Sequence, residues 1–532
     1  MLGEDSRYEL IVIGGGINGA AIAREAQLSG VKVLLLERDD FCSGTSAAST
    51  RLIHGGLRYL EHAEFSLVYE SLSAREQLLK SAPHLVQPLQ IFLPLTHDSR
   101  RGPLMIRLGM LLYDLLSTGK SLSSHRILSR ESLLEALPGL DGGELVAGAA
   151  YYDAQVRFPE RLVLENALDA QASGATLAPH TAVHELLVED GRIVGVVWEA
   201  DGRRGTAWAP VVVNAAGPWV DSVLGPLQET ALIGGTKGSH LITEPFAGAP
   251  AHAVYAEASS DGRPFFVIPW NGLYLIGTTD ERYDGNPSEA SISHAEYDYL
   301  ITETQHLFPG ASDLNRRVCY TCSGIRPLPP TEGVSEGAIT RRHLIKHHRD
   351  VDGLFSVIGG KLTTHRSLAV DCMKRLRRRL KTSGRSPTVD RLLPGALAKN
   401  DRYVLLEDLS QSFGSETAIR LWQVYGAASQ ELADSVREDA ELGQKLGPQC
   451  DLLVGELVRA LEKEHARTLI DVLQRRTMAG LQSDFGQQSA PLAADWLVRL
   501  GIWDRTRAAE EVEAYRYFAR RHAVPSSRGR PN

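Results

Sequence analysis

The spacing of apolar positions at the start of the chain predicts a strand, a helix and a second strand. Residues 8–13 are apolar and partly β-branched, and a glycine cluster then leads into a helical pattern that ends near Ser29 and Gly30. Residues 31–36 form a second apolar run. A strand, turn, helix and strand within about 30 residues are typical of the βαβ unit of a nucleotide-binding fold.

The middle of the chain has the short alternating segments of β structure. Alternation between residues 175 and 197, interrupted by Asp190-Gly191, predicts a β-hairpin. Residues 211–215 predict another buried strand that is again followed by a glycine. From residue 231 to 279, short β-like runs are separated by Gly and Pro. We expect an antiparallel sheet here, distinct from the first layer.

The C-terminal part of the pattern is helical. A helical stretch that begins at Lys361 is followed by a polar linker at 381–387, and residues 450–473 and 490–519 place apolar side chains at three- and four-residue intervals. We therefore place a domain boundary near residue 385, with a helical domain over 386–532. Its last nine residues are rich in Ser, Arg, Pro and Gly and are predicted to be disordered.

Composition narrows the class of protein. The chain has 532 residues, 43% apolar and 23% charged, which suits a folded protein of two or three domains. A net charge of −8 provides no basic field for nucleic acid. Five cysteines indicate a reducing compartment, and the pair Cys319 and Cys322 is interpreted as structural, so no metal site is expected. Without a secretory signal or a spanning segment, we expect a cytoplasmic location or attachment to a membrane from one side.

The strongest chemical motif is the glycine cluster between the first strand and the first helix. Gly14, Gly16 and Gly19 have the Gly-x-Gly-x-x-Gly spacing, which allows a tight turn, close approach to a pyrophosphate and close packing of helix on strand. Glu37 ends the second strand, where a carboxylate accepts hydrogen bonds from ribose hydroxyls. A purely structural turn is the alternative. The motif itself does not separate NAD from FAD.

The segment that follows is unusual in composition. Residues 43–51 are small or hydroxylated, which permits close backbone approach and hydrogen bonds to a cofactor, although such runs more often form a loop and a helix cap. This segment leads into His54-Gly-Gly-Leu-Arg-Tyr-Leu60.

Seven motifs occur in the order found in FAD-dependent glycerol-3-phosphate dehydrogenases, a family that the chain resembles strongly over residues 8–370. They are Asn18 in the glycine turn, residues 46–61, Asn214–Trp219, Lys237–His240, Ile276–Asp280, Ser323–Leu328 and Ile358–Thr364. The tail also resembles the family's C-terminal domain, including Arg475-Arg476-Thr477. No EF-hand spacing is present, which favours the bacterial, respiratory type.

The resemblance implies an α/β fold with three parts. A glutathione-reductase-like, Rossmann-type FAD-binding domain is joined to an antiparallel-sheet substrate domain like that of D-amino-acid oxidase, and an α-helical C-terminal domain follows. Within residues 1–385, the FAD-binding segments are expected at about 8–80, 150–230 and 320–380, and the substrate or cap segments at about 81–149 and 231–319.

The resemblance also assigns FAD-binding residues. Gly14, Gly16, Gly19 and Glu37 hold the ADP half, Val183 lies near the adenine, and Gly217 lies beside the cofactor. The remaining expected contacts are Asn18, Ser46, Ser49, Thr50, Gly359, Gly360, Lys361, Leu362 and Thr363. Lys361 follows two glycines at a helix start, where a cation stabilises negative charge on the flavin.

A phosphate substrate carries a charge of about −1.5 to −2 and calls for a forked cation. Arg326, in an apolar context, is the leading candidate, and its alternative is a buried arginine paired with a protein carboxylate. Arg58 is the second candidate, with a surface helix arginine as its alternative. Tyr59 and Thr279 are expected to add neutral hydrogen bonds to the substrate.

His54 is the candidate general base because related glycerophosphate oxidases use a histidine in this motif, although a lone histidine is more often structural. We count His54, Arg326 and Lys361 as catalytic candidates. The basic stretch Arg341–Arg349 alternates like a solvated strand, and we assign it no catalytic role.

The implied reaction takes sn-glycerol 3-phosphate to dihydroxyacetone phosphate by proton removal and hydride transfer to FAD, with electrons passed to a membrane quinone. Alternatives are an oxidase that uses O2, another amine or amino-acid oxidase of this fold, and a flavin-binding scaffold without activity. A homodimer is a further expectation.

The apolar segment Met105–Leu116, flanked by Arg100, Arg101 and Arg107, predicts peripheral attachment to lipid on the cytoplasmic face of the inner membrane. A helix packed in the core is the alternative.

Overall fold

The computed structural model describes residues 3, 5–60, 63–97, 99, 102–331, 333, 339–448 and 450–525. The side chains of Arg58 and Pro103 are outside that description, as are the predicted lipid-facing residues Arg100 and Arg101 and the tail predicted to be disordered, from residue 526 onwards.

The predicted βαβ unit forms the centre of a six-stranded sheet in the order β19-β20-β12-β2-β3-β8. Neighbouring strands are parallel except for the edge strand β19, which is antiparallel to β20. Every residue of β2 and β3 is buried, as expected for parallel strands covered on both faces. The strands are β2 (Leu10–Ile13), β3 (Val33–Leu36), β8 (Thr176–Ala178), β12 (Val212–Asn214), β19 (Leu344–His347) and β20 (Leu354–Ile358).

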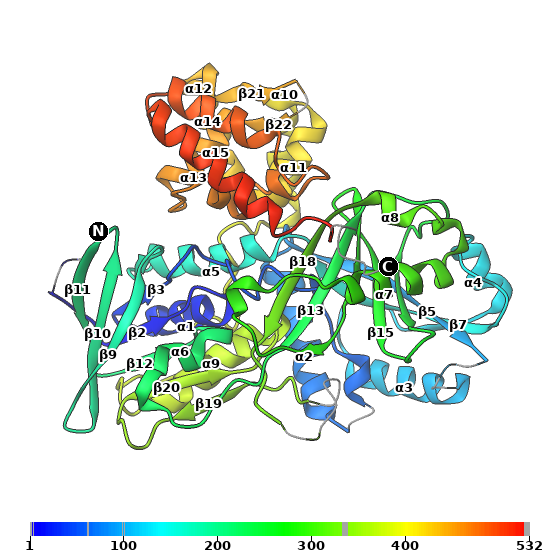
Figure 1. Ribbon diagram of the computed structural model, residues 1–532, viewed down its shortest axis with the longest axis horizontal. Helices are drawn as coiled ribbons and strands as arrows, with labels where there is room; N and C mark the ends of the chain where they lie inside the picture. Colours follow the sequence, from blue (N-terminus) through cyan, green and yellow to red (C-terminus); the bar gives the residue numbers. More distant parts are fainter. Residues whose placement is uncertain are drawn as a thin grey trace, which may run out of the picture.

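Four helices accompany this sheet. Helix α1 (Ile17–Leu28), which starts directly after the glycine turn, packs against both α5 (Pro159–Ala172) and α9 (His365–Leu376). The short helix α6 (Val220–Leu224) follows β12. Figure 1 shows these helices beside the sheet, in the left half of the molecule.

The predicted hairpin is confirmed, with a shifted start. Strands β9 (Ala182–Glu189) and β10 (Arg192–Ala200) are antiparallel, and Asp190 and Gly191 turn between them with φ of 47° and 72°. Two positive φ values are typical of the type I′ turn, whose twist matches that of the strands. The hairpin belongs to a four-stranded sheet, β1-β11-β10-β9, with β1 (Asp5–Arg7) and β11 (Arg203–Trp208).

The predicted antiparallel layer is also confirmed. It is a ten-stranded sheet with the path β17-β13-β16-β15-β14-β5-β7-β4, in which β18 pairs with β13 and β6 with β7. Only the β5–β14 pair is parallel among these described pairs. The strands are β4 (Leu52–Ile53), β5 (Val86–Thr96), β6 (Arg126–Ser129), β7 (Leu145–Val156), β13 (Thr236–Thr243), β14 (Ala253–Glu257), β15 (Pro264–Trp270), β16 (Leu273–Gly277), β17 (Glu281–Arg282) and β18 (Val318–Arg326).

Helices border this large sheet, in the right half of Figure 1. They are α2 (Phe65–Ser81), α3 (Pro103–Leu116), α4 (Arg130–Ala136), α7 (His294–Leu307) and α8 (Leu314–Arg317). Helix α2 contacts α3, and α3 contains the apolar segment singled out in the sequence.

The C-terminal part forms a separate helical lobe, at the top of Figure 1. Its elements are α10 (Lys399–Phe413), α11 (Ser415–Tyr425), α12 (Ser429–Glu438), β21 (Lys445–Gly447), β22 (Cys450–Leu453), α13 (Val454–Glu462), a π-helix (Asp471–Arg476), α14 (Ser489–Arg499) and α15 (Arg505–Arg520). The helix predicted over 450–473 is wrong at both ends, because residues 450–453 form β22 and α13 ends at Glu462. The helix predicted over 490–519 is two helices, because Gly501 turns the chain with φ of 68°.

The order of strands fixes where chemistry can occur. The carboxyl ends of the parallel strands β2, β12 and β20 meet at one edge of the six-stranded sheet. The glycine turn at 14–19, the segment 215–219 and the segment 359–363 follow these three strands directly. Ligands of open parallel sheets bind at this edge, and the turn Gly217–Trp219 at this edge contacts β18 of the large sheet.

Candidate active site

A cavity of about 300 Å³ lies at the carboxyl ends of β2, β12 and β20. Most of the residues predicted to bind FAD line it, although the first and last of them, Gly14 and Leu362, are 348 positions apart. They are Gly14, Gly16, Asn18, Glu37, Ser46, Ser49, Val183, Gly217, Gly359, Gly360, Lys361 and Leu362.

The backbone around this cavity has no room for side chains at the first and third motif glycines, Gly14 and Gly19. Gly14 has φ of +108°, and a Cβ there would lie 2.6 Å from the carbonyl oxygen of Ala215. A Cβ on Gly19 would lie 1.8 Å from the carbonyl oxygen of Gly14. Gly19 does not line the cavity. Its lack of a side chain lets α1 pack closely against the turn, so that the N-terminus of the helix faces the ligand.

Polar groups on the cavity wall fit an adenosine diphosphate moiety. The Glu37 carboxylate accepts hydrogen bonds from the N–H groups of Gly15 (2.6 Å) and Asp39 (2.8 Å), and burial raises its pKa against the effect of these bonds. Asn18 Oδ1 is buried without a partner among the described residues. A carboxylate at the end of the second strand and glycines at the turn are what a dinucleotide requires here, and the orphaned amide oxygen can accept a hydrogen bond from a donor group of a bound ligand.

Besides Gly19, two predicted FAD contacts lie outside this cavity. Thr50 lines a neighbouring cavity, and its hydroxyl bonds His240 Nε2 at 3.0 Å. Thr363 is buried, and its Oγ1 accepts a hydrogen bond from the backbone N–H of His54 at 3.3 Å. Both residues therefore join the cofactor segment to the second cavity.

The second cavity has a volume of about 390 Å³ and lies over the large antiparallel sheet. It contains His54, Tyr59 and Arg326 from the prediction, together with charged residues that the prediction omitted. Those additional residues are Asp153, Arg263, Asp280 and Arg341.

Arg326 and Arg341 share one carboxylate in this cavity. Arg326 Nη1 donates to Asp280 Oδ1 at 3.0 Å, and Arg341 Nη2 donates to Asp280 Oδ2 at 2.9 Å. Burial lowers the pKa of Arg326, and the charge of Arg341 adds to that effect. Arg341 Nη1 has no hydrogen-bond partner among the described residues. Two guanidinium groups held by one carboxylate leave an excess positive charge that suits an anion.

Thr279, predicted to bind the substrate, does not line this cavity. Its side chain is 4% exposed and donates to Glu296 Oε1 at 2.7 Å, away from the cavity. Thr278 lines the cavity instead and accepts a hydrogen bond from Arg326 Nη2 at 2.9 Å. Successive side chains of an extended segment point to opposite sides, so a motif match identifies the segment more readily than the residue that faces the ligand.

The sequence assigned no role to Arg341, which it placed in a solvated strand. The strand is real, since β19 covers Leu344–His347, but Arg341 precedes it and turns into the cavity. Its neighbour Arg342 is exposed. The sequence of the basic run does not distinguish Arg341 from Arg342. Only the ion pair of Arg341 with Asp280 in the folded structure does so. The side chain of Arg58, the second predicted phosphate ligand, is outside the described residues.

His54 lies where the two cavities approach each other. It lines the second cavity, and its backbone is held by Thr363 of the cofactor segment. Burial lowers the pKa of His54 to about 4, and the charge of Lys361 contributes to the shift. The imidazole is therefore neutral near pH 7 and has a nitrogen that can accept a proton.

Lys361 connects the two cavities from the cofactor side. Its ammonium donates to Ser71 Oγ at 2.6 Å and lies 4.6 Å from the centre of the Tyr59 ring. Burial lowers the pKa of Lys361 to about 8, against the opposing charges of nearby acids. This cation therefore lies between the wall of the first cavity and the tyrosine of the second.

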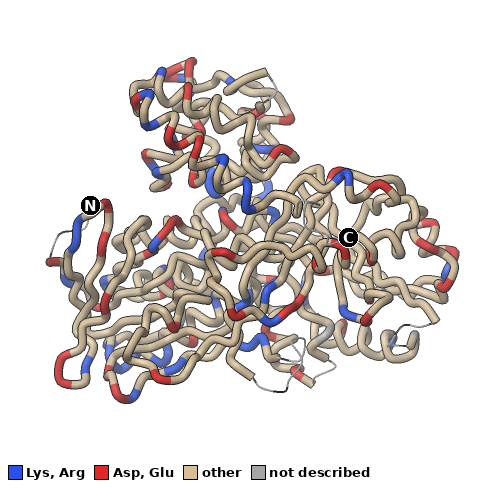
Figure 2. Tube along the Cα trace, in the orientation of Figure 1, with Lys and Arg blue, Asp and Glu red and all other residues tan. Residues whose placement is uncertain are grey.

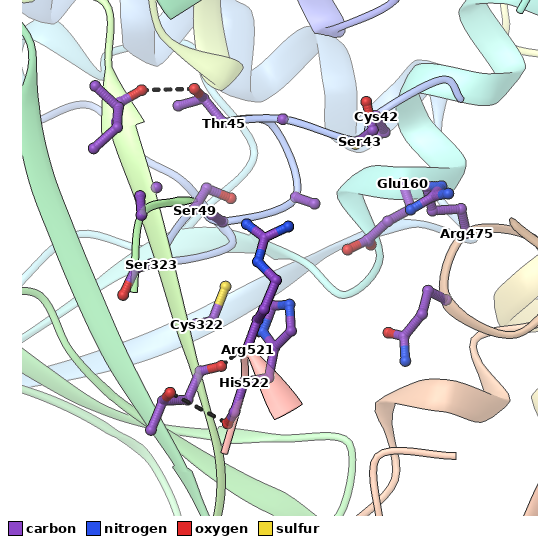
Figure 3. Close-up of a pocket in the computed structure, with 18 of the residues that line it drawn as sticks. Cys42, Ser43, Thr45, Ser49, Glu160, Cys322, Ser323, Arg475, Arg521 and His522 are labelled. Carbon is purple, nitrogen blue, oxygen red and sulfur yellow. Dashed lines mark hydrogen bonds between the residues drawn. The ribbon is translucent and has the colours of Figure 1, made fainter. Parts of the chain in front are cut away.

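A third cavity, of about 200 Å³, lies between the C-terminal lobe and the loop at residues 42–51 (Figure 3). Its buried cations are already paired: Arg51 with Glu160 at 2.8 Å, and Arg475 with Asp40 at 2.6 Å. Cys322 also lines it. Burial raises the pKa of the Cys319 and Cys322 thiols to about 11, which fits the structural interpretation of this pair.

Comparison with known proteins agrees with this geometry. The family described as "FAD dependent oxidoreductase" matches residues 9–366, and the "C-terminal domain of alpha-glycerophosphate oxidase" matches residues 386–508. A glycerol-3-phosphate dehydrogenase of Synechocystis sp. is 41% identical, over 98% of both chains. A D-erythritol 1-phosphate dehydrogenase of Brucella abortus is 36% identical, over 90% of this chain and 95% of its own.

A solved structure of glycerol-3-phosphate dehydrogenase from Bacillus halodurans in complex with FAD superimposes with a TM-score of 0.80 and 27% identity, over 98% of this chain and 96% of its own. The match includes the helical C-terminal lobe because it covers nearly the whole chain. The FAD-binding fold, the antiparallel substrate layer and the helical lobe expected from the sequence are all present. The chain is an FAD-dependent oxidoreductase and belongs to the glycerol-3-phosphate dehydrogenase family.

Proposed function

We propose that this protein oxidises sn-glycerol 3-phosphate to dihydroxyacetone phosphate. The observation that carries the proposal is the second cavity, which has a pair of guanidinium groups on one wall and a neutral histidine next to the cofactor segment. A small substrate with a phosphate at one end and a secondary alcohol at the other needs cations to bind the phosphate and a base to accept the hydroxyl proton.

Arg326 and Arg341 bind the phosphate in this proposal. Asp280 orients both guanidinium planes before the substrate arrives, so little side-chain freedom is lost on binding. Because one carboxylate neutralises only one of the two cations, the pair keeps a surplus positive charge that attracts the anionic phosphate. An uncharged polyol would leave the surplus cation unpaired inside a partly buried cavity.

His54 accepts the proton of the C2 hydroxyl. Its low pKa keeps it neutral, and its backbone bond to Thr363 holds it beside the cofactor segment. FAD, when bound, supplies the acceptor for the hydride that leaves C2. Lys361 places a positive charge where negative charge increases during the reaction, and its bond to Ser71 fixes that position.

The experiment uses anaerobic stopped-flow measurement of flavin absorbance with sn-glycerol 3-phosphate. We expect His54→Ala to slow the loss of visible absorbance by about 10²–10⁴-fold, the range for a lost general base. Arg326→Lys should weaken substrate binding despite its charge, because an ammonium cannot bind two phosphate oxygens in a fork. A wild-type rate in His54→Ala removes histidine as the base.

The same experiment discriminates among substrates. D-erythritol 1-phosphate, named for the Brucella relative, is compared with sn-glycerol 3-phosphate, and glycine is included as an amino acid without phosphate. The proposal requires the highest kcat/KM for sn-glycerol 3-phosphate. Faster reaction with the longer phosphate would reassign the substrate but keep the arginine pair, whereas faster reaction with glycine would contradict the whole scheme. A protein that binds FAD but reacts with none of them would be a scaffold.

We further propose that helix α3 attaches the protein to a lipid surface. One face of α3 is buried through Ile106, Met110 and Tyr113. The opposite face has five side chains that are 54–82% exposed: Leu104, Met105, Leu108, Leu111 and Leu115. Phe65 and Tyr69 of the neighbouring α2 are also exposed. Contiguous apolar patches of this kind on a solvent-exposed surface mark interaction sites.

Lipid suits this face better than water does. Arg107 on α3 is exposed, and Figure 2 shows the helix as mostly uncharged, at the lower right edge of the molecule. Apolar side chains with a few cations are typical of helices that lie in the interface of an anionic membrane. None of the helices in the described part of the chain combines the length and the apolar character needed to cross a bilayer.

A membrane quinone is the electron acceptor that fits this attachment. With lipid vesicles that contain a quinone, turnover should continue under nitrogen and should yield no peroxide in air. Rapid aerobic turnover with stoichiometric peroxide would favour an oxidase instead. Sedimentation with anionic vesicles at low salt tests attachment itself, independently of the acceptor.

A further inference from the structure

The C-terminal lobe contributes none of the described residues that line the two active-site cavities. Its π-helix nevertheless contacts the two loops that form the adenosine side of the FAD cavity. One loop follows Glu37 at the end of β3, and the other joins β8 to β9 through His180 and Thr181. These contacts are made by charged side chains; those of Asp40, Asp471 and Arg476 are buried, and those of Arg475 and His180 are partly exposed.

The first loop is held through Asp40, which is 0% exposed. Arg476 donates two hydrogen bonds to its two carboxylate oxygens, at 2.7 and 2.8 Å, and Arg475 Nε donates a third at 2.6 Å. Asp40 lies three residues after Glu37, and Asp39 between them donates its N–H to the Glu37 carboxylate. Figure 3 shows Arg475 entering from the C-terminal lobe on the side of Cys42 and Ser43.

The second loop is held through His180. Its Nε2 lies 3.0 Å from Asp471 Oδ2, and Arg475 donates to the other oxygen of Asp471 at 2.6 Å. Burial lowers the pKa of His180, but the hydrogen bond and charge of Asp471 exceed that effect, so the pKa is raised overall. The backbone of the same loop donates to the first loop, from His180 to Asp39 and from Thr181 to Glu37.

We propose that this interdomain ion cluster, defined as Asp40, His180, Asp471, Arg475 and Arg476, holds the adenosine side of the cavity closed around FAD. Arg475, Arg476 and Asp471 are positioning residues: they do not line the FAD cavity but fix the loop after Glu37 and the loop before Val183. The inference rests on the proposed placement of the ADP half of FAD between these two loops.

The chemistry of the cluster supports positioning rather than metal binding. The ligand atoms of Asp40, His180 and Asp471 lie within 4.8 Å of one another, a spacing that a cation could use. Both carboxylates, however, are already bonded by guanidinium groups. Two arginines and a histidine face two carboxylates, so the cluster is balanced without a further cation. Opposite charges at hydrogen-bond distance in a buried site fix geometry strongly, since breaking one leaves its partner uncompensated.

The test measures FAD release from the full-length holoenzyme, without any substrate. The fluorescence of released FAD after dilution gives the dissociation rate, and titration with added FAD gives the Kd. Two variants weaken the cluster: Arg476→Lys, which keeps the charge but loses the fork, and His180→Asn, which removes the imidazole. Asn suits position 180 because φ is 54° there.

Arg420→Lys is the matched control. Arg420 forms a two-pronged pair with Glu456, at 2.6 and 2.8 Å, entirely within the C-terminal lobe. It should lower the melting temperature of the protein and leave the Kd for FAD unchanged. For the two cluster variants we expect the Kd to rise by about 10- to 100-fold, the size expected when a charge-assisted hydrogen bond is lost.

An unchanged Kd in His180→Asn overturns the proposal, as does an equal rise in Arg420→Lys. If Arg476→Lys does not fold, His180→Asn decides, because its side chain is partly exposed and its loss leaves no buried charge on its own loop. Since no substrate is present, these outcomes do not depend on whether sn-glycerol 3-phosphate is the substrate.

Discussion

Removal of the Arg341 side-chain charge should weaken substrate binding far more than removal of the same charge at the next position. Arg341 lines the second cavity, its Nη2 is bonded to Asp280, and its Nη1 has no partner among the described residues. Arg342 is exposed on the outside of the same segment. Arg341→Gln and Arg342→Gln therefore change the net charge equally and differ only in geometry.

The expected size follows from the contacts. A hydrogen bond to a charged group contributes about 1.5–3 kcal/mol, and the phosphate loses one or two such bonds while Arg326 remains. At 1.4 kcal/mol per decade, one lost bond raises the substrate dissociation constant by about 10- to 150-fold. For Arg342→Gln only the long-range charge effect remains, which salt screens, so the change should stay below about threefold at physiological ionic strength.

The assay is the anaerobic stopped-flow experiment, with the substrate dissociation constant taken from the dependence of the flavin reduction rate on substrate concentration. The limiting rate should change little, because Arg341 lies at the phosphate end and not beside His54. FAD content and melting temperature are checked in both variants. Equal dissociation constants in Arg341→Gln and wild type, or equal effects of the two variants, would show that Arg341 does not bind the phosphate.

Four further outcomes are expected. The pKa of His54 is lowered to about 4 and that of Lys361 to about 8, so flavin reduction should be fast between pH 4 and pH 8. The rate should fall below pH 4 because His54 becomes protonated, and above pH 8 because Lys361 loses its charge. Lys361→Met should abolish the decrease at alkaline pH. Gly14→Ala should leave the purified protein largely without FAD, because φ is +108° and a Cβ would lie 2.6 Å from a carbonyl oxygen. Thr278→Val should weaken substrate binding by about 1 kcal/mol through loss of its bond to Arg326, whereas Thr279→Val should mainly lower the melting temperature. Leu111→Glu should abolish sedimentation with anionic vesicles and leave flavin reduction unchanged; sedimentation equal to wild type would remove α3 as the lipid-binding surface.

The local sequence determined the cofactor fold because its signals act over short distances. The glycine spacing at 14–19 requires a strand before it and a helix after it, and Glu37 must end the next strand, so these residues lie together whatever the rest of the chain does. The type I′ turn at Asp190-Gly191 is likewise fixed by two residues. Patterns that continue for many residues were less reliable, as the split of 490–519 into two helices shows.

Tertiary structure alone decided which charged residues meet. Asp280 and Arg341 are separated by 61 positions, and Asp40 and Arg476 by 436, yet each pair is in direct contact. Sequence periodicity does not predict such pairs, because an arginine in the sequence is most simply interpreted as a solvated surface residue. Its carboxylate partner is known only once the fold has buried the two side chains together. For the same reason Thr278 and Thr279 were indistinguishable in the sequence, and only the direction of the chain at the cavity wall separated them. Local propensities and spacings therefore fixed the cofactor-binding framework of this protein. The electrostatics of its substrate cavity depend on contacts that exist only after the sheets have packed, and the ion cluster around Asp40 exists only after the C-terminal lobe has packed as well.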